Sequence, residues 1–173
     1  MKTTTILVAG VAVFLAACQS MSTDGPKASA VLEPTKGSTV RGNASFTQVG
    51  NQVRVTANIS GLKPSSEFGF HIHEAGDCSS GDGMSAKGHF NPENKPHGRA
   101  GTPEHHGGDL PSLTSDAAGN ATVNALVDVV TVTPGPNSVV GRGLIVHAQA
   151  DDYKTQPTGN AGARSACAVI RAS

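Results

Sequence analysis

Histidine is unusually frequent in this chain of 173 residues, which contains seven. Two of them, His71 and His73, are separated by one residue, and on a β-strand that spacing points both imidazoles to the same face. A third, His147, ends the apolar run 144–147. If the two strands are neighbours, three imidazoles converge, and such a group suits copper or zinc. A single histidine on a strand is more often an ordinary hydrogen-bonded residue, so the pair is what predicts a metal site.

A second set of candidate ligands lies in the segment that follows His73. Its members are His89, His97, His106 and Asp109. Three imidazoles and one carboxylate form a closed tetrahedral set of the kind that zinc prefers. The alternative is that histidines in a glycine-rich loop are exposed and bind nothing, which would require six of the seven to be arranged by coincidence. His105 has no place in either set, and we expect it to be a surface residue beside the ligand His106.

Short strands are expected to hold these residues. Glycine (21) and proline (10) are abundant, which favours strands joined by turns over a helical bundle. Residues 39–49 and 52–59 flank Gly50-Asn51, a two-residue hairpin signal. Within 52–59 apolar and polar residues alternate, as in a strand with one buried face. Further strands are expected at residues 67–73, 112–115, 122–127, 143–148 and 166–171.

Two long segments without periodicity separate these strands, at residues 74–111 and 151–163. Loops of that length are uncommon unless they are functional. We therefore predict one all-β domain, an antiparallel barrel or sandwich whose long loops carry the site. Thirteen basic and thirteen acidic residues cancel, so the charge does not favour a nucleic-acid partner.

The N-terminus is expected to be a targeting segment rather than part of the domain. Residues 1–17 combine a short positive start with an apolar run too short to span a bilayer as a mature helix. They lead into Leu15-Ala16-Ala17-Cys18, which resembles a bacterial lipobox. This predicts a lipoprotein signal peptide at 1–17, a lipidated flexible tether at 18–27 and the domain at 28–173. The alternative is an ordinary signal peptide in which Cys18 has no role.

Cysteine usage agrees with export. If Cys18 carries lipid, Cys78 and Cys167 remain, and in an oxidising compartment they should form a disulfide rather than two buried thiols. Such a bond closes a loop of about 90 residues, which stabilises a fold by roughly 4–5 kcal/mol in the chain-entropy picture. We expect the protein in the cell envelope, periplasmic and anchored to a membrane through Cys18, with the outer membrane favoured by Gln19.

Several motifs together resemble the copper–zinc superoxide dismutases. They are Gly69-Phe70-His71-Ile72-His73-Glu74-Ala75-Gly76-Asp77-Cys78, Gly88-His89-Phe90-Asn91-Pro92, His106-Gly107-Gly108-Asp109-Leu110, Val146-His147 and residues 159–170, which include Arg164 and Cys167. The resemblance covers most of residues 28–170. It implies an eight-stranded antiparallel Greek-key β-barrel, an immunoglobulin-like sandwich with two long functional loops.

The resemblance also implies a role for each residue. His71, His73, His89 and His147 match the copper ligands, and His89, His97, His106 and Asp109 match the zinc ligands. His89 would then bridge both metals as an imidazolate. Asp151 matches a carboxylate that joins a copper-ligand histidine to a zinc-ligand histidine, and Arg164 matches the arginine that guides the anion. Cys78 and Cys167 match the family disulfide.

The expected reaction converts superoxide to dioxygen and hydrogen peroxide, with one copper and one zinc ion per subunit, and protects the cell envelope. A copper-only dismutase would lack part of the zinc set, and a copper chaperone would lack copper ligands or Arg164, whereas this chain has them all. A hydrolytic zinc enzyme would need an open position on zinc, whereas this zinc set is closed. A metal-buffering lipoprotein is the best alternative, since it needs the ligands but not Arg164. The charged cluster usual in the second loop is not matched, which leaves Lys87 and Lys154 as candidates for steering. Monomer and homodimer both stay open.

Overall fold

The structure is a computed structural model that describes residues 25–173. The predictions for the signal peptide and for Cys18 fall outside these residues. Within 25–173, no helix is long and apolar enough to cross a bilayer.

The regular secondary structure of residues 25–173 consists of short β-strands, apart from one 3-10 helix. They are β1 (Lys27–Pro34), β2 (Arg41–Val49), β3 (Gln52–Ser60), β4 (Glu67–Phe68), β5 (Phe70–His73), β6 (Leu113–Thr114), β7 (Ala121–Val127), β8 (Gly143–His147), β9 (Arg164–Val169) and β10 (Arg171–Ala172). A 3-10 helix at Met84–Ala86 interrupts the first long loop.

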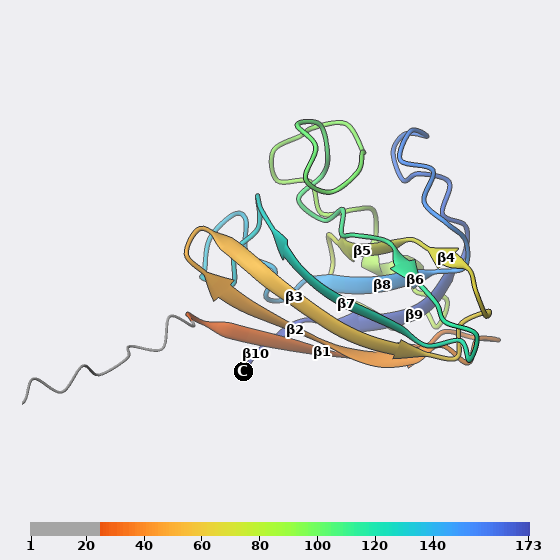
Figure 1. Ribbon diagram of the computed structural model, residues 1–173. Helices are drawn as coiled ribbons and strands as arrows, with labels where there is room; N and C mark the ends of the chain where they lie inside the picture. Colours follow the sequence, from red (N-terminus) through yellow and green to blue (C-terminus); the bar gives the residue numbers. More distant parts are fainter. Residues whose placement is uncertain (1–24) are drawn as a thin grey trace, which may run out of the picture.

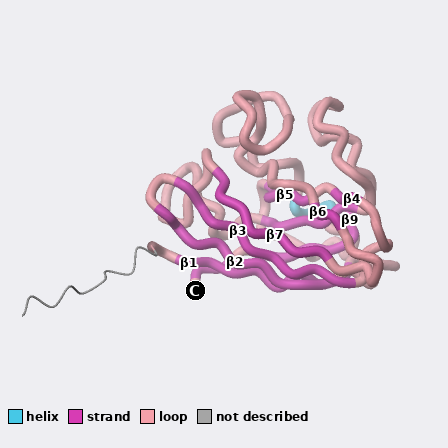
Figure 2. Tube along the Cα trace, viewed as in Figure 1, coloured by secondary structure: helices cyan, strands magenta, loops and turns pink. Residues whose placement is uncertain are grey.

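One curled antiparallel sheet forms the frame of the molecule. Its strands follow the order β5-β8-β9-β1-β2-β3-β7, with β10 paired to β1, while β4 and β6 form a separate pair. The sheet bends at β1, which pairs with β2 along most of its length and with β9 at its end. Figures 1 and 2 show the long loops rising from one side of this frame. The antiparallel all-β barrel expected from the sequence is confirmed.

The core lies inside the curl and follows the strand alternation. On β3, Val53, Val55, Ala57 and Ile59 are buried while their neighbours are more exposed, as predicted. The hairpin at Gly50 is also confirmed, since Val49 and Gln52 are paired on either side of the turn. Burying each large aliphatic side chain stabilises such a core by about 1.5–3 kcal/mol.

Strand β1 was not predicted, and it includes the last residue of the predicted tether. Lys27, placed at the end of the flexible tether, is the first residue of β1 and is paired with Thr47. The alternation is present, with Ala28 and Ala30 buried between exposed neighbours. Alanine is depleted in strands and gives a weak apolar signal, so the pairing with β2, rather than local propensity, determines this strand.

The two predicted long loops are confirmed, and a third was missed. Residues 74–112 connect β5 to β6, and residues 148–163 connect β8 to β9. Residues 128–142 also form a connection without strands, between β7 and β8. Val130, Val132 and Val139 in this segment are buried in the core, so its apolar residues do not mark a strand.

Candidate metal centre

Strand β5 presents two histidines on one face, as the sequence predicts. His71 and His73 are fully buried, and Ile72 between them belongs to the hydrophobic core. The neighbouring strand β8 pairs Val146 with Phe70. This pairing brings His147 beside the first two rings, with its Nε2 atom 3.4 Å from Nε2 of His73.

The first long loop returns to the other edge of β5. The backbone N–H of Ile72 donates to Gly108 O at 2.8 Å, and that of Phe90 donates to Ile72 O at 2.9 Å. A side chain at Gly108 would collide with the Ile72 carbonyl, so only glycine permits this approach. These bonds place His89 and Asp109, which form isolated bridges with β5, directly beside the strand histidines.

All seven predicted ligands come together in two buried groups. The ligand atoms within each group lie within 4.8 Å of one another. The first group is His71, His73, His89 and His147, and the second is His89, His97, His106 and Asp109. His89 belongs to both, so the two groups are adjacent.

The second group converges on one carboxylate oxygen. Asp109 Oδ1 lies 2.8 Å from His89 Nδ1, 3.0 Å from His97 Nδ1 and 3.5 Å from His106 Nδ1. The other oxygen, Oδ2, accepts hydrogen bonds from the backbone N–H groups of Gly98 and His106. Three Nδ1 atoms and one carboxylate oxygen thus face a common point, which is the donor set that zinc prefers.

The first group contains nitrogens that have no hydrogen-bonding role. Among residues 25–173, His71 Nδ1 and His89 Nε2 are the buried side-chain atoms without a partner. His73 and His147 direct Nδ1 to the carbonyls of Lys87 and Gly162, which leaves their Nε2 atoms facing inward. A buried polar atom without a partner is costly, and four converging imidazole nitrogens fit copper.

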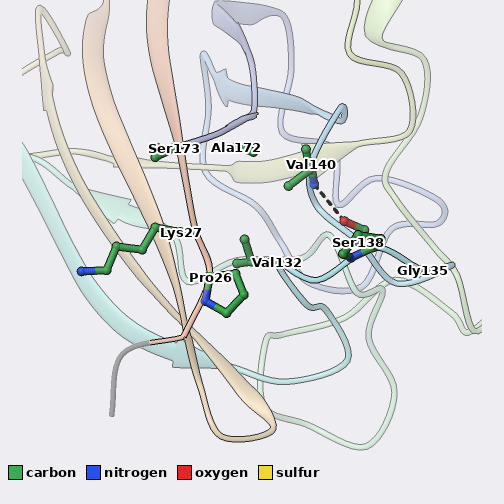
Figure 3. A pocket seen from close by; sticks show the side chains of 9 residues that line it. Pro26, Lys27, Val132, Gly135, Ser138, Val140, Ala172 and Ser173 are labelled. Atoms are coloured by element: carbon green, nitrogen blue, oxygen red, sulfur yellow. Dashed lines mark hydrogen bonds between the residues drawn. The ribbon is translucent and has the colours of Figure 1, made fainter. Parts of the chain in front are cut away.

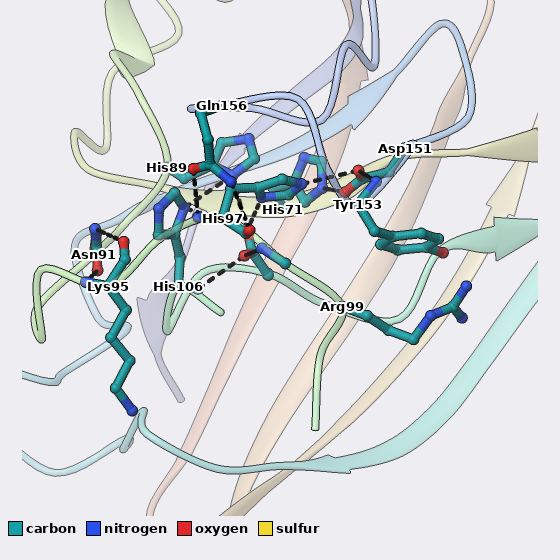
Figure 4. Close-up of polar contacts among 12 residues, drawn as sticks. His71, His89, Asn91, Lys95, His97, Arg99, His106, Asp151, Tyr153 and Gln156 are labelled. Carbon is teal, nitrogen blue, oxygen red and sulfur yellow. Dashed lines mark hydrogen bonds and ion pairs between the residues drawn. The ribbon is translucent and has the colours of Figure 1, made fainter. Parts of the chain in front are cut away.

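Asp151 joins the two groups from the second long loop (Figure 4). Its Oδ2 lies 2.8 Å from His71 Nε2, and its Oδ1 lies 2.9 Å from His97 Nε2. Each contact uses the ring nitrogen opposite to the one that faces the ligand group. A carboxylate in this position fixes both the tautomer and the orientation of the rings.

The environment favours neutral imidazoles in the first group. Burial, with the neighbouring histidines, lowers the pKa of His89 to about 4 and that of His147 to about 3. Burial also lowers the pKa of His73 well below its usual 6.5. Because a metal binds only to a ring nitrogen that carries no proton, these three uncharged rings can bind a metal at neutral pH.

Two carboxylates shift the pKa of His97 in the opposite direction, upwards. Burial opposes its charged form, but hydrogen bonds with Asp109 and Asp151 outweigh burial and raise the pKa of His97 to about 9. Burial likewise opposes the charged form of Asp109, yet bonds from His106, His89 and His97 hold its pKa well below the usual range. Asp109 is therefore ionised and supplies a negative charge that suits a divalent cation, and binding of the metal displaces the proton of His97.

Arg164, the first residue of β9, lies beside the four-histidine group. Its guanidinium donates to Gly83 O and Lys87 O, and Lys87 O is also the acceptor for His73 Nδ1. Its positive charge is among the causes that lower the pKa of His73 and His147. A half-buried cation with fork geometry is thus held next to the predicted copper ligands.

The predicted disulfide is present. Cys78 and Cys167 are bonded, with an S–S distance of 2.05 Å and a sequence separation of 89. The bond ties the first long loop to β9, the strand that begins with Arg164.

The expectation for His105 was wrong. Its side chain is buried rather than on the surface, with 4% of the residue exposed. Its Nδ1 lies 2.6 Å from Thr102 O, and its Nε2 lies 3.2 Å from Asp128. His105 therefore fastens the loop to the end of β7, while His106 alone faces the ligand group.

A pocket with a volume of about 510 Å³ lies away from this centre (Figure 3). It is lined by residues at both ends of the described chain, including Pro26 and Ser173, and by residues of the 128–142 connection, including Val132 and Val140. None of the metal-binding candidates lines it. This pocket is thus separate from the two buried histidine groups.

The carbonyls that orient the histidines could not be read from the sequence. Lys87 and Gly162 act through backbone oxygens, and residue type does not reveal such a role. Lys87 also adopts a positive φ of 64°, which is unusual for a side chain of this kind. Gln156 contacts His97 and Tyr153 contacts Asp151. Both lie in the second loop, and the sequence did not predict either contact.

Comparison with known proteins agrees with this geometry. Residues 40–170 match the family model described as copper/zinc superoxide dismutase. "Superoxide dismutase [Cu-Zn] 2" of Aquifex aeolicus (strain VF5) is 42% identical over 149 residues, covering 84% of this chain and 86% of that protein. "Superoxide dismutase [Cu-Zn] 1" of the same organism is 41% identical over 134 residues, covering 75% and 79%.

A solved structure is similar as well. The crystal structure of the clock protein EA4 superposes with a TM-score of 0.76 at 42% identity, covering 84% of this chain and 93% of that one. With the two buried ligand groups, the shared histidine and the match over residues 40–170, the chain belongs to the copper/zinc superoxide dismutase family.

Proposed function

We propose that this protein converts superoxide to dioxygen and hydrogen peroxide with its four-histidine group holding copper and its three-histidine and aspartate group holding zinc. Family membership provides the reaction and the two cofactors. The assignment of each metal rests on the donor sets, since imidazoles alone suit copper and the added carboxylate suits zinc. The observation that carries the proposal is His89, whose two ring nitrogens face the two groups.

Copper, held by the four-histidine group, would supply the electron transfer by which two superoxide ions and two protons become dioxygen and hydrogen peroxide. His89 is suited to handle one of these protons. Its Nε2 is buried without a hydrogen-bond partner, whereas its Nδ1 is fixed by Asp109. A proton can be held at Nε2 without disturbing the bond at Nδ1.

Arg164 is proposed to attract and orient the anion. It is half-buried beside His73 and His147, and its guanidinium is held by two carbonyls. Because those bonds satisfy only part of its five N–H donors, the rest are free to meet a small anion. A fixed cation at a low-dielectric site raises the local concentration of superoxide.

We also propose that the protein is exported, lipidated at Cys18 and anchored in the cell envelope, where it protects against superoxide. Support comes from the Leu15-Ala16-Ala17-Cys18 sequence and from the disulfide, which forms in oxidising compartments. A homodimer is one of the two assemblies that the family resemblance implies, and sedimentation of the purified domain distinguishes it from a monomer.

The proposed division of labour is tested by removing one ligand from each group. His73→Gln should abolish dismutation while one zinc stays bound, because His73 belongs only to the four-histidine group. His106→Gln should weaken zinc binding while copper stays bound. Metal content and the rate of superoxide decay are measured on both variants. Full activity of His73→Gln would refute the assignment of copper to that group.

A metal-buffering role is the second candidate, favoured by the low pKa values that keep the imidazoles ready for a metal. It predicts tight metal binding without turnover. It leaves the guanidinium beside His73 without a purpose, and for that reason we prefer the enzymatic role.

A further inference from the structure

Two residues of the second long loop, Tyr153 and Gln156, make contacts that the reaction described above does not use. Neither is a candidate ligand. The Gln156 side chain contacts His97, and the backbone N–H of Tyr153 contacts Asp151, the carboxylate that joins the two groups. Figure 4 shows Gln156 and Tyr153 on opposite sides of the rings and carboxylates of the centre.

Gln156 binds the backbone of His97 through both ends of its amide. Its Oε1 accepts from His97 N at 2.8 Å, and its Nε2 donates to His97 O at 2.9 Å. Paired bonds of this kind reproduce what a neighbouring strand would supply. They fix the main chain of a zinc-ligand candidate from a different loop, 59 residues away in sequence.

Tyr153 anchors the segment that carries Asp151. Its backbone N–H donates to Asp151 Oδ1 at 2.7 Å. Its hydroxyl lies 2.6 Å from Ser112 Oγ and donates to Glu67 Oε1 at 3.0 Å. The guanidinium carbon of Arg99 lies 3.9 Å from the centre of its ring. The ring thus sits between the barrel, through β4, and the loop that carries His97.

These contacts surround the one carboxylate that joins the groups. Asp151 is bonded to the rings of His71 and His97, and its Oδ1 also accepts from the backbone N–H of Tyr153. Gln156 fixes the main chain of His97, one of the two rings that Asp151 orients. His97 is thereby held at its ring and at its main chain by the same loop. Partners of this kind affect the affinity of a site although they do not touch the metal.

We infer that Tyr153 and Gln156 are positioning residues, which hold Asp151 and His97 in the arrangement that retains zinc. The inference rests on the proposed assignment of zinc to the group that contains His97. It says nothing of turnover, so it is tested by zinc retention rather than by activity.

The alternative is that both residues only stabilise the loop. Gln156 is largely exposed, so its loss should leave the barrel folded. A purely structural role would lower the unfolding temperature of the metal-free chain. A positioning role would speed zinc release while the metal-free unfolding temperature stays close to that of the wild type.

The test measures zinc release from the full mature chain, loaded with copper and zinc, into an excess of a coloured chelator. The variants are Gln156→Ala, Gln156→Glu and Tyr153→Phe. Gln156→Glu keeps an acceptor for His97 N but cannot donate to His97 O. Tyr153→Phe removes the hydroxyl but keeps the ring against Arg99. Lys154→Gln, in the same loop and exposed, is the matched control.

We expect both Gln156 variants to release zinc about tenfold faster than the wild type, in line with other residues that orient metal ligands. Tyr153→Phe should have a smaller effect in the same direction, and Lys154→Gln should have none. Release within twofold of the wild type in both Gln156 variants would overturn the inference. An effect confined to Gln156 would remove Tyr153 from it.

Failure of this inference is distinguishable from failure of the proposed function. A wild type that binds copper and zinc without dismutating superoxide refutes the function, yet zinc release still reports on Gln156. Conversely, an active enzyme whose zinc release ignores Gln156 refutes only the inference.

Discussion

At the scale of single residues, the two ligand groups are defined by which nitrogen each histidine turns inward. His73 and His147 use Nδ1 for a backbone carbonyl, whereas His97 uses Nε2 for Asp151. His89 has Nε2 free and Nδ1 beside Asp109. These outer bonds sort seven similar ligands into two groups of different chemistry.

The anion-guiding role of Arg164 gives the first prediction. Arg164→Ala should lower kcat/KM for superoxide by a factor on the order of ten or more, because a fixed cation beside the site raises the encounter rate by about 10–10³-fold. Both metals should stay bound, since Arg164 is not a ligand. Arg164→Lys is the control and should retain part of the activity. Stopped-flow decay of superoxide and metal analysis measure both effects, and an unchanged rate in Arg164→Ala would refute the role.

The shifted histidines predict how the stability of the metal-free chain depends on pH. His89 and His147 stay neutral in the fold down to pH values of about 4 and about 3, whereas they titrate near 6.5 when unfolded. The unfolded chain therefore binds more protons below pH 6.5, and stability should fall as the pH is lowered, by about 1.4 kcal/mol per pH unit for each residue.

The contribution of His97 to stability depends on pH in the opposite way. Its pKa of about 9 in the fold exceeds the usual 6.5, so its contribution is complete below pH 6.5 and is lost as the pH rises towards 9. The free energy of unfolding should thus be greatest near pH 6.5, as measured by denaturant titration of the metal-free chain. A curve that rises steadily from pH 4 to pH 9 would contradict these assignments.

Residue types and spacing were enough to predict most of the side chains that come together in the two groups, and the family resemblance placed His89 in both. The outer partners were another matter. His105 and His106 are adjacent and identical in type. The sequence assigned the ligand role to His106, but nothing in it indicated that His105 is buried against Asp128. In the structure the backbone N–H of His106 donates to Asp109 Oδ2, and His106 lies in the second group.

At the scale of elements, the two groups form because both long loops pack against strand β5. The first long loop pairs with the free edge of β5, and the second closes over it through Asp151. The length of the two loops was enough to predict that they are functional. The sequence did not predict where the first loop meets β5, because the contact of Gly108 with the carbonyl of Ile72 has no local sequence pattern.

Gly159 shows how closely the second loop approaches the centre and gives a prediction at this scale. A Cβ atom there would collide with Asp151 Oδ1, and φ is +65°. Gly159→Ala should separate Asp151 from His97 and weaken zinc binding by about 10–100-fold, as measured by competition with a chelator.

Gly50 provides the matched control. It has a similar φ of +59°, but a Cβ atom there meets nothing within 4 Å. Gly50→Ala therefore carries the same backbone strain without the collision and should leave zinc affinity unchanged. Equal loss of affinity in both variants would attribute the effect to general destabilisation.

At the scale of the whole molecule, the sequence predicted the class of fold better than its limits. The series of short predicted strands and the two long loops were sufficient for an antiparallel barrel or sandwich, and the family resemblance specified the barrel. Strand β1 was missed because small alanines fill its buried positions, and it is the strand that joins β2 to β9. Lys27, the last residue of the predicted tether, accordingly belongs to the barrel.

The predicted membrane anchor depends on Cys18. Cys18→Ser should move the protein from the membrane fraction to the soluble fraction, because it removes the acyl chains, each buried methylene of which contributes about 0.8 kcal/mol. Ser20→Ala, two residues away, is the control and should stay with the membrane. Immunoblots of the separated fractions measure the distribution, and membrane association of Cys18→Ser would refute lipidation.

The most direct test of the whole account is the dismutation rate of the mature chain loaded with copper and zinc, compared with the same chain loaded with zinc alone. Rapid decay of superoxide is predicted with both metals and none above the uncatalysed rate with zinc alone, because zinc does not change its oxidation state. No turnover with one copper and one zinc bound would contradict the account and leave metal buffering as the function.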